Sequence, residues 1–321
     1  MSKDNESRIL TKVARMYYID EMNQSQIAKK LGVHRTTISR MLKKAREEEI
    51  VKIEIDNDYN EYIELERKLE ENFNLKEVCV VPSSSKQTEE VKKRNLGLAG
   101  VDLLKRIIKD GNIMGFAWGT TLAALAEELL AHKEECKSAD LTIIPLVGGP
   151  GDMNNKYDVN TIISKVATTF NATERHLYVP AITSEKSTKE ALIKDANIRE
   201  VLEFWDKVDI AVVGIGTPIK SSNMIWTGYF GNEDIEYLTE KNAVGDICSR
   251  YYDIDGNIID SYISDRTIAI ELEKLQDINY SIAVAESVDK VPSILGALRG
   301  GFINVLITNE ITARKLINYK L

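Results

Sequence analysis

From about residue 75 to its end, the chain alternates continuous apolar segments with amphipathic ones. The apolar segments have the length of strands and lie at residues 78–81, 112–119, 141–149, 176–181, 208–217, 280–287 and 303–310. Helical spacing of apolar residues fills the stretches 89–109, 121–131, 159–170, 187–205 and 291–299. Apolar strands that alternate with helices are typical of a mostly parallel sheet covered on both faces. The sequence therefore predicts an α/β domain over residues 75–321.

Three of these apolar segments end in glycines, at Gly119, at Gly148 and Gly149, and at residues 214–216. Ligands of open parallel sheets bind at the carboxyl ends of the strands. Gly119 is followed by Thr120 and Thr121 and then by a helix, whose N-terminal N–H groups can bind a phosphate. The same residues also cap helices that bind nothing, but three such ends on one edge favour a phosphate site. No Walker A or complete dinucleotide motif is present, which disfavours ATP and NAD.

Residues 24–46 contain seven Lys or Arg and no Asp or Glu. Their apolar residues have the spacing of two short helices separated by Gly32 and Val33. The first apolar face holds Ile27, Ala28 and Leu31, and the second holds Ile38, Met41 and Leu42. Two short helices joined by a turn with glycine form a helix-turn-helix pattern. A preceding helix at residues 7–19 would complete a three-helix core.

The second helix of this pattern starts near His34 and is rich in side chains that suit a DNA groove, since Arg pairs with guanine and Ser or Thr with bases or phosphates. The expected DNA contacts are Ser25, Gln26, His34, Arg35, Thr36, Thr37, Ser39, Arg40, Lys43 and Lys44. The alternative is a solvated basic helix without a ligand. Residues 1–55 have a net charge of +4 and the chain −8, so the rest carries −12. Such a basic head on an acidic body would hold DNA at one end only.

Two further elements separate the head from the α/β domain. Val51, Ile53 and Ile55 alternate with charged residues and predict a strand, which would make residues 1–57 a winged, otherwise all-α, helix-turn-helix domain. Residues 58–74 predict a linker helix, and its apolar positions are close to a heptad spacing. These positions are Tyr62, Leu65, Leu69 and Phe73. The seam either pairs with another subunit, which we favour, or docks on the chain's own body.

The composition limits the remaining possibilities. With 43% hydrophobic residues the chain can bury a large core. It has no apolar run of the ~20 residues needed to cross a bilayer and no signal peptide at its N-terminus, so we expect a cytoplasmic protein without a membrane partner. Cys79, Cys136 and Cys248 are far apart and, with only three histidines, disfavour a metal site. We expect these cysteines to be reduced thiols.

Several motifs together resemble the SorC family of bacterial transcriptional regulators, and in particular its deoxyribonucleoside-regulator branch. They are the basic run at residues 25–51, the WGTT turn at 118–121, AVGDICSRYYDIDGNII at 243–259 and LGALRGGFINVLITNEITARKL at 295–316. The resemblance covers essentially the whole chain. It implies a body with the sugar-isomerase-like Rossmann fold, a phosphorylated sugar as effector, operator DNA as partner, and a homo-oligomer that is a dimer or a tetramer.

The resemblance also implies where the effector would bind. Residues 119–121 match the family's phosphate-binding turn, Asp246 an acidic position near the sugar hydroxyls, and Lys290 a basic position that closes over the phosphate. The expected effector contacts are Gly119, Thr120, Thr121, Gly148, Gly149, Asp158, Asn160, Asp246 and Lys290. No other cofactor is implied.

Val147 departs from the pattern of the branch. Some of its members hold an aldehyde sugar phosphate as a Schiff base on a lysine at this position, and valine cannot form an imine. We therefore expect a non-covalent effector and a regulator, with repression as the family-level expectation for its sign. The alternative is a sugar-phosphate isomerase with an appended head, in which Asp246, Asp265 or Lys290 would do acid–base work. No nucleophile–base pair supports it, and Asp265 and Arg266 are expected to form an internal ion pair.

Overall fold

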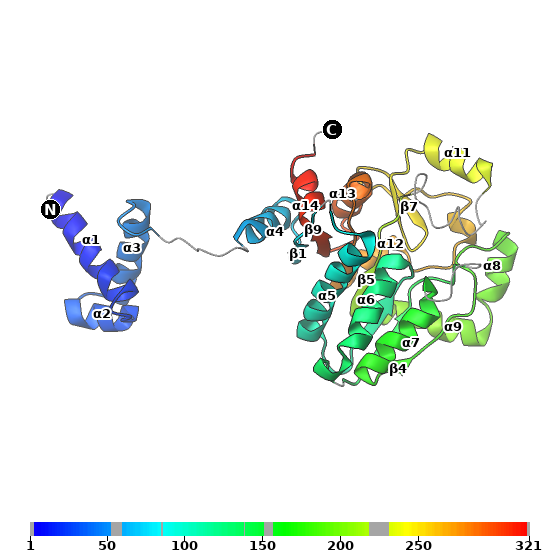
Figure 1. The fold of residues 1–321 in the computed structure, drawn as a ribbon, viewed down its shortest axis with the longest axis horizontal. Coiled ribbons are helices and arrows are strands. Elements are labelled where there is room, and N and C mark those ends of the chain that lie inside the picture. The colour runs from blue at the N-terminus through cyan, green and yellow to red at the C-terminus, as the bar shows by residue number, and fades with distance from the viewer. Residues whose placement is uncertain are drawn as a thin grey trace. The chain divides into compact units, whose positions relative to one another are not determined.

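The computed structural model describes residues 3–52, 60–84, 86–137, 139–150, 157–217 and 231–319. The chain divides into two compact units, Met1–Asn60 and Glu61–Leu321 (Figure 1). We call the first unit the head and the second the body, and each is described by itself.

The head consists of three helices, α1 (Lys3–Tyr18), α2 (Gln24–Leu31) and α3 (Arg35–Glu47). Asn23 starts α2 with a capping box: its side chain accepts from the Gln26 N–H at 3.0 Å, and the Gln26 side chain accepts from the Asn23 N–H at 2.9 Å. This exchange satisfies two of the N–H groups that a helix start leaves free. Gly32 ends α2 in the left-handed conformation, with φ 67°, and so turns the chain into α3.

The apolar faces expected for α2 and α3 form the core of the head. The buried members of this core are Val13, Met16, Ile27, Ala28, Ile38 and Leu42, while Leu31 and Met41 are partly buried against it. Val51 lies in a bend and packs on the neighbouring cluster of Leu10, Ala14 and Ala45. The rest of the predicted wing strand, including Ile53 and Ile55, lies outside the described residues, so the wing stays a prediction.

The body is built on a seven-stranded sheet in which all neighbours are parallel. Its strands, in spatial order, are β1 (Glu77–Val81), β9 (Val305–Asn309), β8 (Tyr280–Val284), β5 (Ile210–Val213), β2 (Ile113–Phe116), β3 (Thr142–Pro145) and β4 (Thr173–Glu174). Every residue of β5 and β9 is buried, as expected for strands with helices on both faces. The predicted parallel α/β architecture is confirmed.

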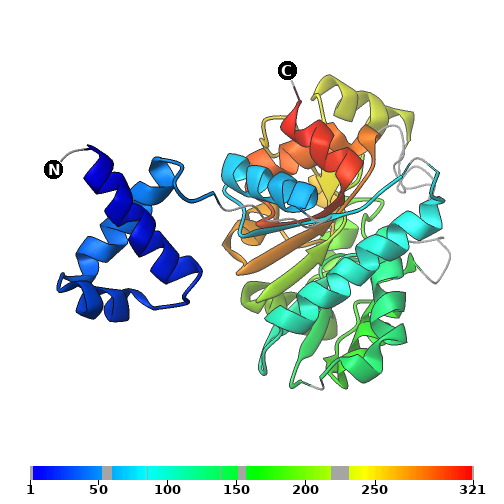
Figure 2. The same ribbon diagram turned by 60° about the vertical axis from the view of Figure 1, so that its left-hand side comes forward.

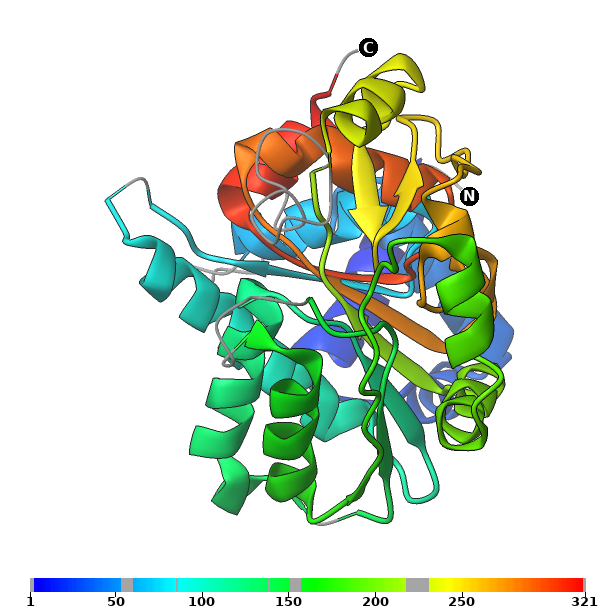
Figure 3. The same cartoon turned by 90° about the vertical axis from the view of Figure 1, so that its right-hand side faces the viewer.

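Helices cover both faces of the sheet. Figure 3 shows α5, α6 and α7 together on one side and α8 and α9 on the other. The helices of the body are α4 (Asn60–Phe73), α5 (Glu89–Ile107), α6 (Thr120–Ala131), α7 (Val159–Phe170), α8 (Lys186–Leu192), α9 (Ala196–Leu202), α11 (Asn232–Glu240), α12 (Leu272–Asp277), α13 (Val291–Arg299) and α14 (Glu310–Ile317). An antiparallel pair of strands lies outside the large sheet and consists of β6 (Gly245–Ile247) and β7 (Arg250–Tyr252). The 3-10 turns are η1 (Lys133–Glu135), η3 (Glu203–Lys207), η4 (Ser264–Arg266) and η5 (Val288–Lys290). In the described ranges, none of the helices is both long and apolar enough to span a bilayer.

Two predicted elements of the body are wrong. The strand expected at residues 176–181 is replaced by the two-residue β4, and the segment that follows leaves the sheet with Tyr178 81% exposed. Pro180 in that segment has no N–H to donate to a strand ladder. The long helix expected at residues 187–205 is divided into α8, α9 and η3, because Asp195 caps a new helix by accepting from the N–H of Asn197 at 2.9 Å.

The linker helix α4 uses its apolar seam within its own chain. Leu65 and Leu69 are buried in the core of the body, and Tyr62 and Phe73 pack against the same core. Figure 2 shows α4 beside α14, and an ion pair between Glu61 and Arg314 joins the two helices. This is docking on the body, the alternative to the favoured seam between subunits, whereas oligomerisation itself stays a prediction.

The same helix protects the edge of the sheet. β1 is an edge strand, and an unpaired edge is a template for aggregation. Glu66 accepts a hydrogen bond from the Val80 N–H at 2.8 Å, and Glu70 accepts one from the Val78 N–H at 2.9 Å. Two carboxylates of α4 thus take the place of a further strand.

We therefore expect Glu66→Ala to destabilise the body by ~1–3 kcal/mol, because the N–H of Val80 loses its acceptor. Chemical denaturation followed by circular dichroism measures this loss. Glu71→Ala on the same helix is the control, because it removes only an exposed ion pair with Arg67 and should change stability by less than ~0.5 kcal/mol. Equal effects of the two substitutions would contradict the edge-capping role.

Candidate functional site

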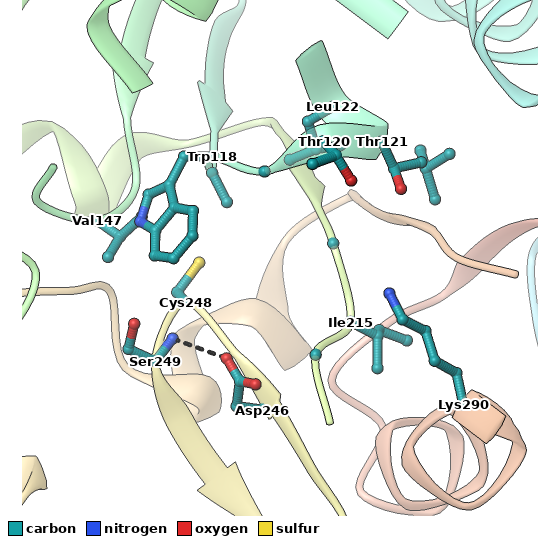
Figure 4. A pocket seen from close by; sticks show the side chains of 15 residues that line it. Trp118, Thr120, Thr121, Leu122, Val147, Ile215, Asp246, Cys248, Ser249 and Lys290 are labelled. Carbon is teal, nitrogen blue, oxygen red and sulfur yellow. Dashed lines mark hydrogen bonds between the residues drawn. The ribbon is translucent and has the colours of Figure 1, made fainter. Parts of the chain in front are cut away.

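A pocket lies where β2, β5 and β8 end, at the carboxyl edge of the sheet (Figure 4). Its lining residues come from the segment that joins β2 to α6, the segments after β3, β5 and β8, and the β6–β7 hairpin. They are Ala117, Trp118, Gly119, Thr120, Thr121, Leu122, Val147, Gly214, Ile215, Gly216, Asp246, Cys248, Ser249, Val284 and Lys290. Five of the nine expected effector contacts are therefore brought together here, namely residues 119–121, Asp246 and Lys290.

The N-terminus of α6 forms one wall of this pocket. Gly119 precedes the helix with φ 133°, a conformation that disfavours any residue with a side chain, and no side chain caps the helix start. The carbonyl of Gly119 already accepts from Ala123 N–H at 2.9 Å, so the helix is complete from its first residue. The N–H groups of its first turn and the hydroxyls of Thr120 and Thr121 together make a site for an anion.

Lys290 supplies a positive charge to the same space. It is half-buried at the end of η5, just after β8, and Figure 4 shows its ammonium directed toward the region of Thr120 and Thr121. Burial lowers the pKa of the Lys290 ammonium, while the carboxylates of Asp246 and Glu286 act in the opposite direction. A bound anion would stabilise the charged form further, because an opposite charge in a partly buried site favours it.

Hydrogen bonds of Ser287 fix the loop that carries Lys290. Ser287 has φ 121°, which is unusual for a residue with a side chain. Its N–H donates to the Thr312 hydroxyl at 3.0 Å, and its own hydroxyl accepts from the Asp289 N–H at 3.3 Å. Thr312 is fully buried on α14. These contacts fix the backbone from which the Lys290 side chain enters the pocket.

The β6–β7 hairpin provides the opposite, acidic end. Cys248 and Ser249 form a two-residue turn with φ 53° and 63°, both left-handed, as in a type I′ hairpin. The Ser249 N–H donates to Oδ2 of Asp246 at 3.3 Å. Burial raises the pKa of the Asp246 carboxyl to about 6, against the opposing effects of the Ser249 N–H and the Lys290 ammonium. Cys248 is a buried free thiol whose pKa burial also raises.

Gly216 is required by the position of Asp246. The two residues exchange backbone hydrogen bonds, from Gly216 N–H to the Asp246 carbonyl at 2.9 Å and back at 3.3 Å. A Cβ at Gly216 would overlap with the carboxylate of Asp246. The glycine therefore lets a carboxylate lie directly over the end of β5.

Four expected effector contacts do not line this pocket. Gly148 and Gly149 pack under the segment at residues 179–180: a Cβ at Gly148 would overlap with the Pro180 carbonyl, and the Gly149 N–H donates to the Val179 carbonyl at 2.7 Å. Asp158 caps α7 by accepting from the Asn160 N–H at 2.8 Å, and Asn160 accepts from the Leu177 N–H at 3.0 Å. These residues have packing and capping roles, and Asp158 and Asn160 border a separate surface groove with His176.

Trp118, Ile215, Cys248 and Ser249 line the pocket but were not among the expected contacts. Trp118 belongs to the WGTT turn, so its position next to Gly119 was an available signal. The hairpin residues gave no such signal, because a turn of two residues with side chains in the left-handed conformation is uncommon. Val147 is fully buried at the wall.

Of the three residues considered for acid–base catalysis, Asp246 and Lys290 line the pocket and Asp265 does not. Asp265 and Arg266 do not pair with each other, which corrects that expectation. Asp265 pairs with Lys186 at 3.2 Å on the surface, while Arg266 pairs with Asp234 at 2.6 Å in a buried position. Neither residue lines the pocket.

In the head, the residues expected to contact DNA lie on or near α3. His34, Arg35, Thr36, Ser39, Arg40 and Lys43 are exposed, as are Ser25 and Gln26 on α2, and Thr37 is half-buried. Lys44 is half-buried and pairs with Glu6, so its charge is partly neutralised. Arg35 and Arg40 form no ion pair with any residue in the described part of the chain.

Comparison with known proteins places the chain among transcriptional regulators. The family model described as "Putative sugar-binding domain" matches residues 57–318. The chain is 38% identical over 318 residues to the sorbitol operon regulator of Klebsiella pneumoniae, covering 99% of this chain and 100% of that protein. It is 36% identical over 317 residues to the deoxyribonucleoside regulator of Bacillus subtilis (strain 168), covering 98% and 99%.

The solved structures agree with these sequence relationships. The crystal structure of the full-length sorbitol operon regulator SorC from Klebsiella pneumoniae matches with a TM-score of 0.76 at 38% identity, covering 97% of this chain and 98% of that one. The relatives are named as regulators and not as enzymes, which removes the isomerase alternative. The chain therefore belongs to the SorC family of sugar-binding transcriptional regulators.

Proposed function

We propose that this protein is a DNA-binding repressor whose operator affinity is controlled by a phosphorylated sugar held non-covalently in the pocket of the body. The observation that carries the proposal is the pairing of an uncapped helix start with Lys290 in one pocket. A phosphoryl group needs several N–H donors and a cation, and both are present. Such a protein would act in the cytoplasm, where its operator DNA is found.

The other end of the pocket suits a sugar. Asp246 offers a carboxylate that can accept hydrogen bonds from hydroxyl groups, and Trp118 and Ile215 offer apolar surface for the carbon skeleton. Binding sites for small ligands commonly combine such surfaces with a few polar groups. Val147 carries no amine, so the wall offers no Schiff base at this position, which supports non-covalent binding.

In the head, we propose that α2 and α3 are a helix-turn-helix and that α3 enters the major groove. Its exposed Arg, Thr and Ser side chains have the chemistry for bases and phosphates. A homo-oligomer, dimeric or tetrameric, would present two heads to a two-fold operator. Effector and DNA are then coupled if the sugar phosphate has different affinities for two arrangements of the subunits.

We expect Arg40→Ala and Arg35→Ala each to weaken operator binding by ~1–3 kcal/mol, because each removes a guanidinium that can pair with guanine or phosphate. Fluorescence anisotropy with a labelled operator at fixed salt measures the change. Stabilisation by the effector should be retained in both variants. Loss of DNA binding and effector binding together would contradict the separation of the two functions.

A thermal-shift screen of phosphorylated trioses, pentoses, deoxypentoses and hexoses tests the effector. Binding stabilises the folded state by about 2.7 kcal/mol at a hundredfold excess over Kd, so a matching sugar phosphate raises the melting temperature measurably. In Thr120→Val, which removes a hydroxyl from the phosphate site, we expect this shift to be lost while operator binding is kept. Thr168→Val is the control, because Thr168 lies on α7 beside the separate surface groove.

Two other results of the thermal-shift screen would contradict the proposed phosphate site. If no sugar phosphate shifts the wild-type melting temperature, the phosphate site at residues 119–121 is wrong. If Thr168→Val loses the response and Thr120→Val keeps it, the effector binds in the other groove.

Burial of the Asp246 carboxylate lowers the free energy of unfolding, and the size of this effect depends on pH. Its pKa is raised from 3.8 to about 6 in the folded chain, so the folded state binds the proton more tightly than the unfolded state. The stability that Asp246 contributes therefore falls as pH rises from 3.8 to about 6, and it stays low above this range. We expect Asp246→Asn to be ~1–3 kcal/mol more stable than wild type at pH 7.5, and this difference to shrink to less than ~1 kcal/mol near pH 4.

Denaturant unfolding at the two pH values measures this difference. Asp255→Asn is the control, because Asp255 lies on an exposed turn and pairs with Arg299 at 3.5 Å. A variant that is less stable than wild type at pH 7.5 would show that Asp246 supports the fold instead of burdening it.

A further inference from the structure

Arg250 is a buried cation beside the pocket to which neither the sequence nor the comparisons assign a role. It begins β7, directly after the turn at Cys248 and Ser249, and its side chain is 7% exposed. It does not line the pocket. A buried guanidinium is costly unless its donors are satisfied, so its partners indicate what it does.

Within the part of the chain that the structure describes, the hydrogen-bond and ion-pair partners of this guanidinium lie in one short segment. Nε donates to the Ile270 carbonyl at 2.8 Å, Nη2 donates to the Ala269 carbonyl at 3.0 Å, and Nη2 also pairs with the carboxylate of Glu271. The planar fork of arginine can hold several acceptors at fixed angles, which the single ammonium of lysine cannot do. Arg250 therefore ties the hairpin to residues 269–271.

That segment is in turn paired with the opposite wall of the pocket. The Ile270 N–H donates to the Leu146 carbonyl at 2.8 Å, the Gly148 N–H donates to the Ile268 carbonyl at 2.9 Å, and Val147 and Ala269 form an antiparallel bridge. Val147 lines the pocket. Through this ladder, one side chain connects the wall at Val147 with the turn that follows Asp246.

The turn needs such support. Cys248 and Ser249 both have positive φ although neither is glycine, and each such residue persists only where the surroundings hold it. On the side of α13, the hydroxyl of Tyr252 donates to the Ser293 carbonyl at 3.0 Å. On the side of the pocket wall, Arg250 holds the strand that follows the turn.

We propose that Arg250 is a positioning residue that sets the sugar-recognising end of the pocket without touching the effector. It fixes the turn whose Ser249 N–H orients the Asp246 carboxylate at a set distance from Val147. The phosphate end is built on other elements, α6 and η5, and is independent of Arg250. This inference rests on the proposed function, in which a sugar phosphate binds in this pocket.

Arg250→Lys in the full-length chain separates the two ends. Graded thermal shifts with the sugar phosphates of the screen, and with inorganic phosphate, give an apparent affinity for each ligand. We expect the affinity for the best sugar phosphate to fall about tenfold or more, because the Asp246 carboxylate is no longer oriented. The affinity for inorganic phosphate and the basal binding of operator DNA should stay within about twofold of wild type.

Arg266→Lys is the matched control. Arg266 is half-buried and pairs with the buried Asp234, but its guanidinium has no contact with residues 268–271 and it lines no part of the pocket. We expect it to lose stability without a change in either affinity. Glu271→Ala is a milder variant that removes one partner of Arg250 and leaves both carbonyls, and it should weaken sugar phosphate binding by less than Arg250→Lys does.

Each outcome decides between the possibilities. Equal losses for sugar phosphate and inorganic phosphate in Arg250→Lys would show a general structural role and overturn the inference. Unchanged sugar phosphate affinity would also overturn it. If Arg250→Lys melts too low for titration, Glu271→Ala replaces it, and wild-type affinity in that variant overturns the inference. If the wild type responds to no sugar phosphate, the proposed function fails and the inference fails with it.

Discussion

Parallel pairing of β2, β5 and β8 is the constraint on which the body depends. Parallel strands all have their carboxyl ends at one edge of the sheet. The segments that follow β2, β5 and β8 therefore lie close together at that edge. Helix α6 starts at that edge, and its first turn lines the space between the segments. The pocket is thus a consequence of the sheet topology, and the residues in it decide what the pocket can bind.

Those residues have been placed there at a cost to stability. Asp246 is held in a site that disfavours its charge, Lys290 likewise, and the turn at Cys248 and Ser249 uses conformations that residues with side chains avoid. Strain and buried charge of this kind gather at functional sites and are offset by the surrounding fold. Here the offset comes from neighbours that do not line the pocket, such as Thr312 under Ser287 and Arg250 beside the turn.

How much of this could be read from the sequence depends on whether the signal is local. The head helices, the turn at residues 119–121 and the strands other than the one predicted at residues 176–181 have local patterns, and the structure has them within a few residues of their predicted bounds. Gly148 and Gly149 pack against the segment that contains Pro180 and so do not line the pocket. The role of Asp158 depends on the helix that it caps. Contacts between segments far apart in the chain leave no periodic signal. The sequence therefore does not distinguish the glycines and acidic residues that line the pocket from those that pack or cap elsewhere.

The linker helix shows the same limit. The spacing of Leu65 and Leu69 predicted an apolar seam, and the structure confirms that this face is buried. A seam pattern does not identify its partner, because a neighbouring subunit and the chain's own core are equally apolar. The deciding contacts are those of Glu66 and Glu70 with the N–H groups of β1, which are specific to this edge strand.

The most direct test of the account is a crystal structure of the body with the sugar phosphate that stabilises it most. We predict that the phosphoryl oxygens accept hydrogen bonds from the backbone N–H groups at the start of α6, with the Lys290 ammonium beside them and the sugar hydroxyls at Asp246. A phosphoryl group bound instead in the groove beside Asp158 and His176, or a sugar with no contact to Asp246, would contradict the central claim.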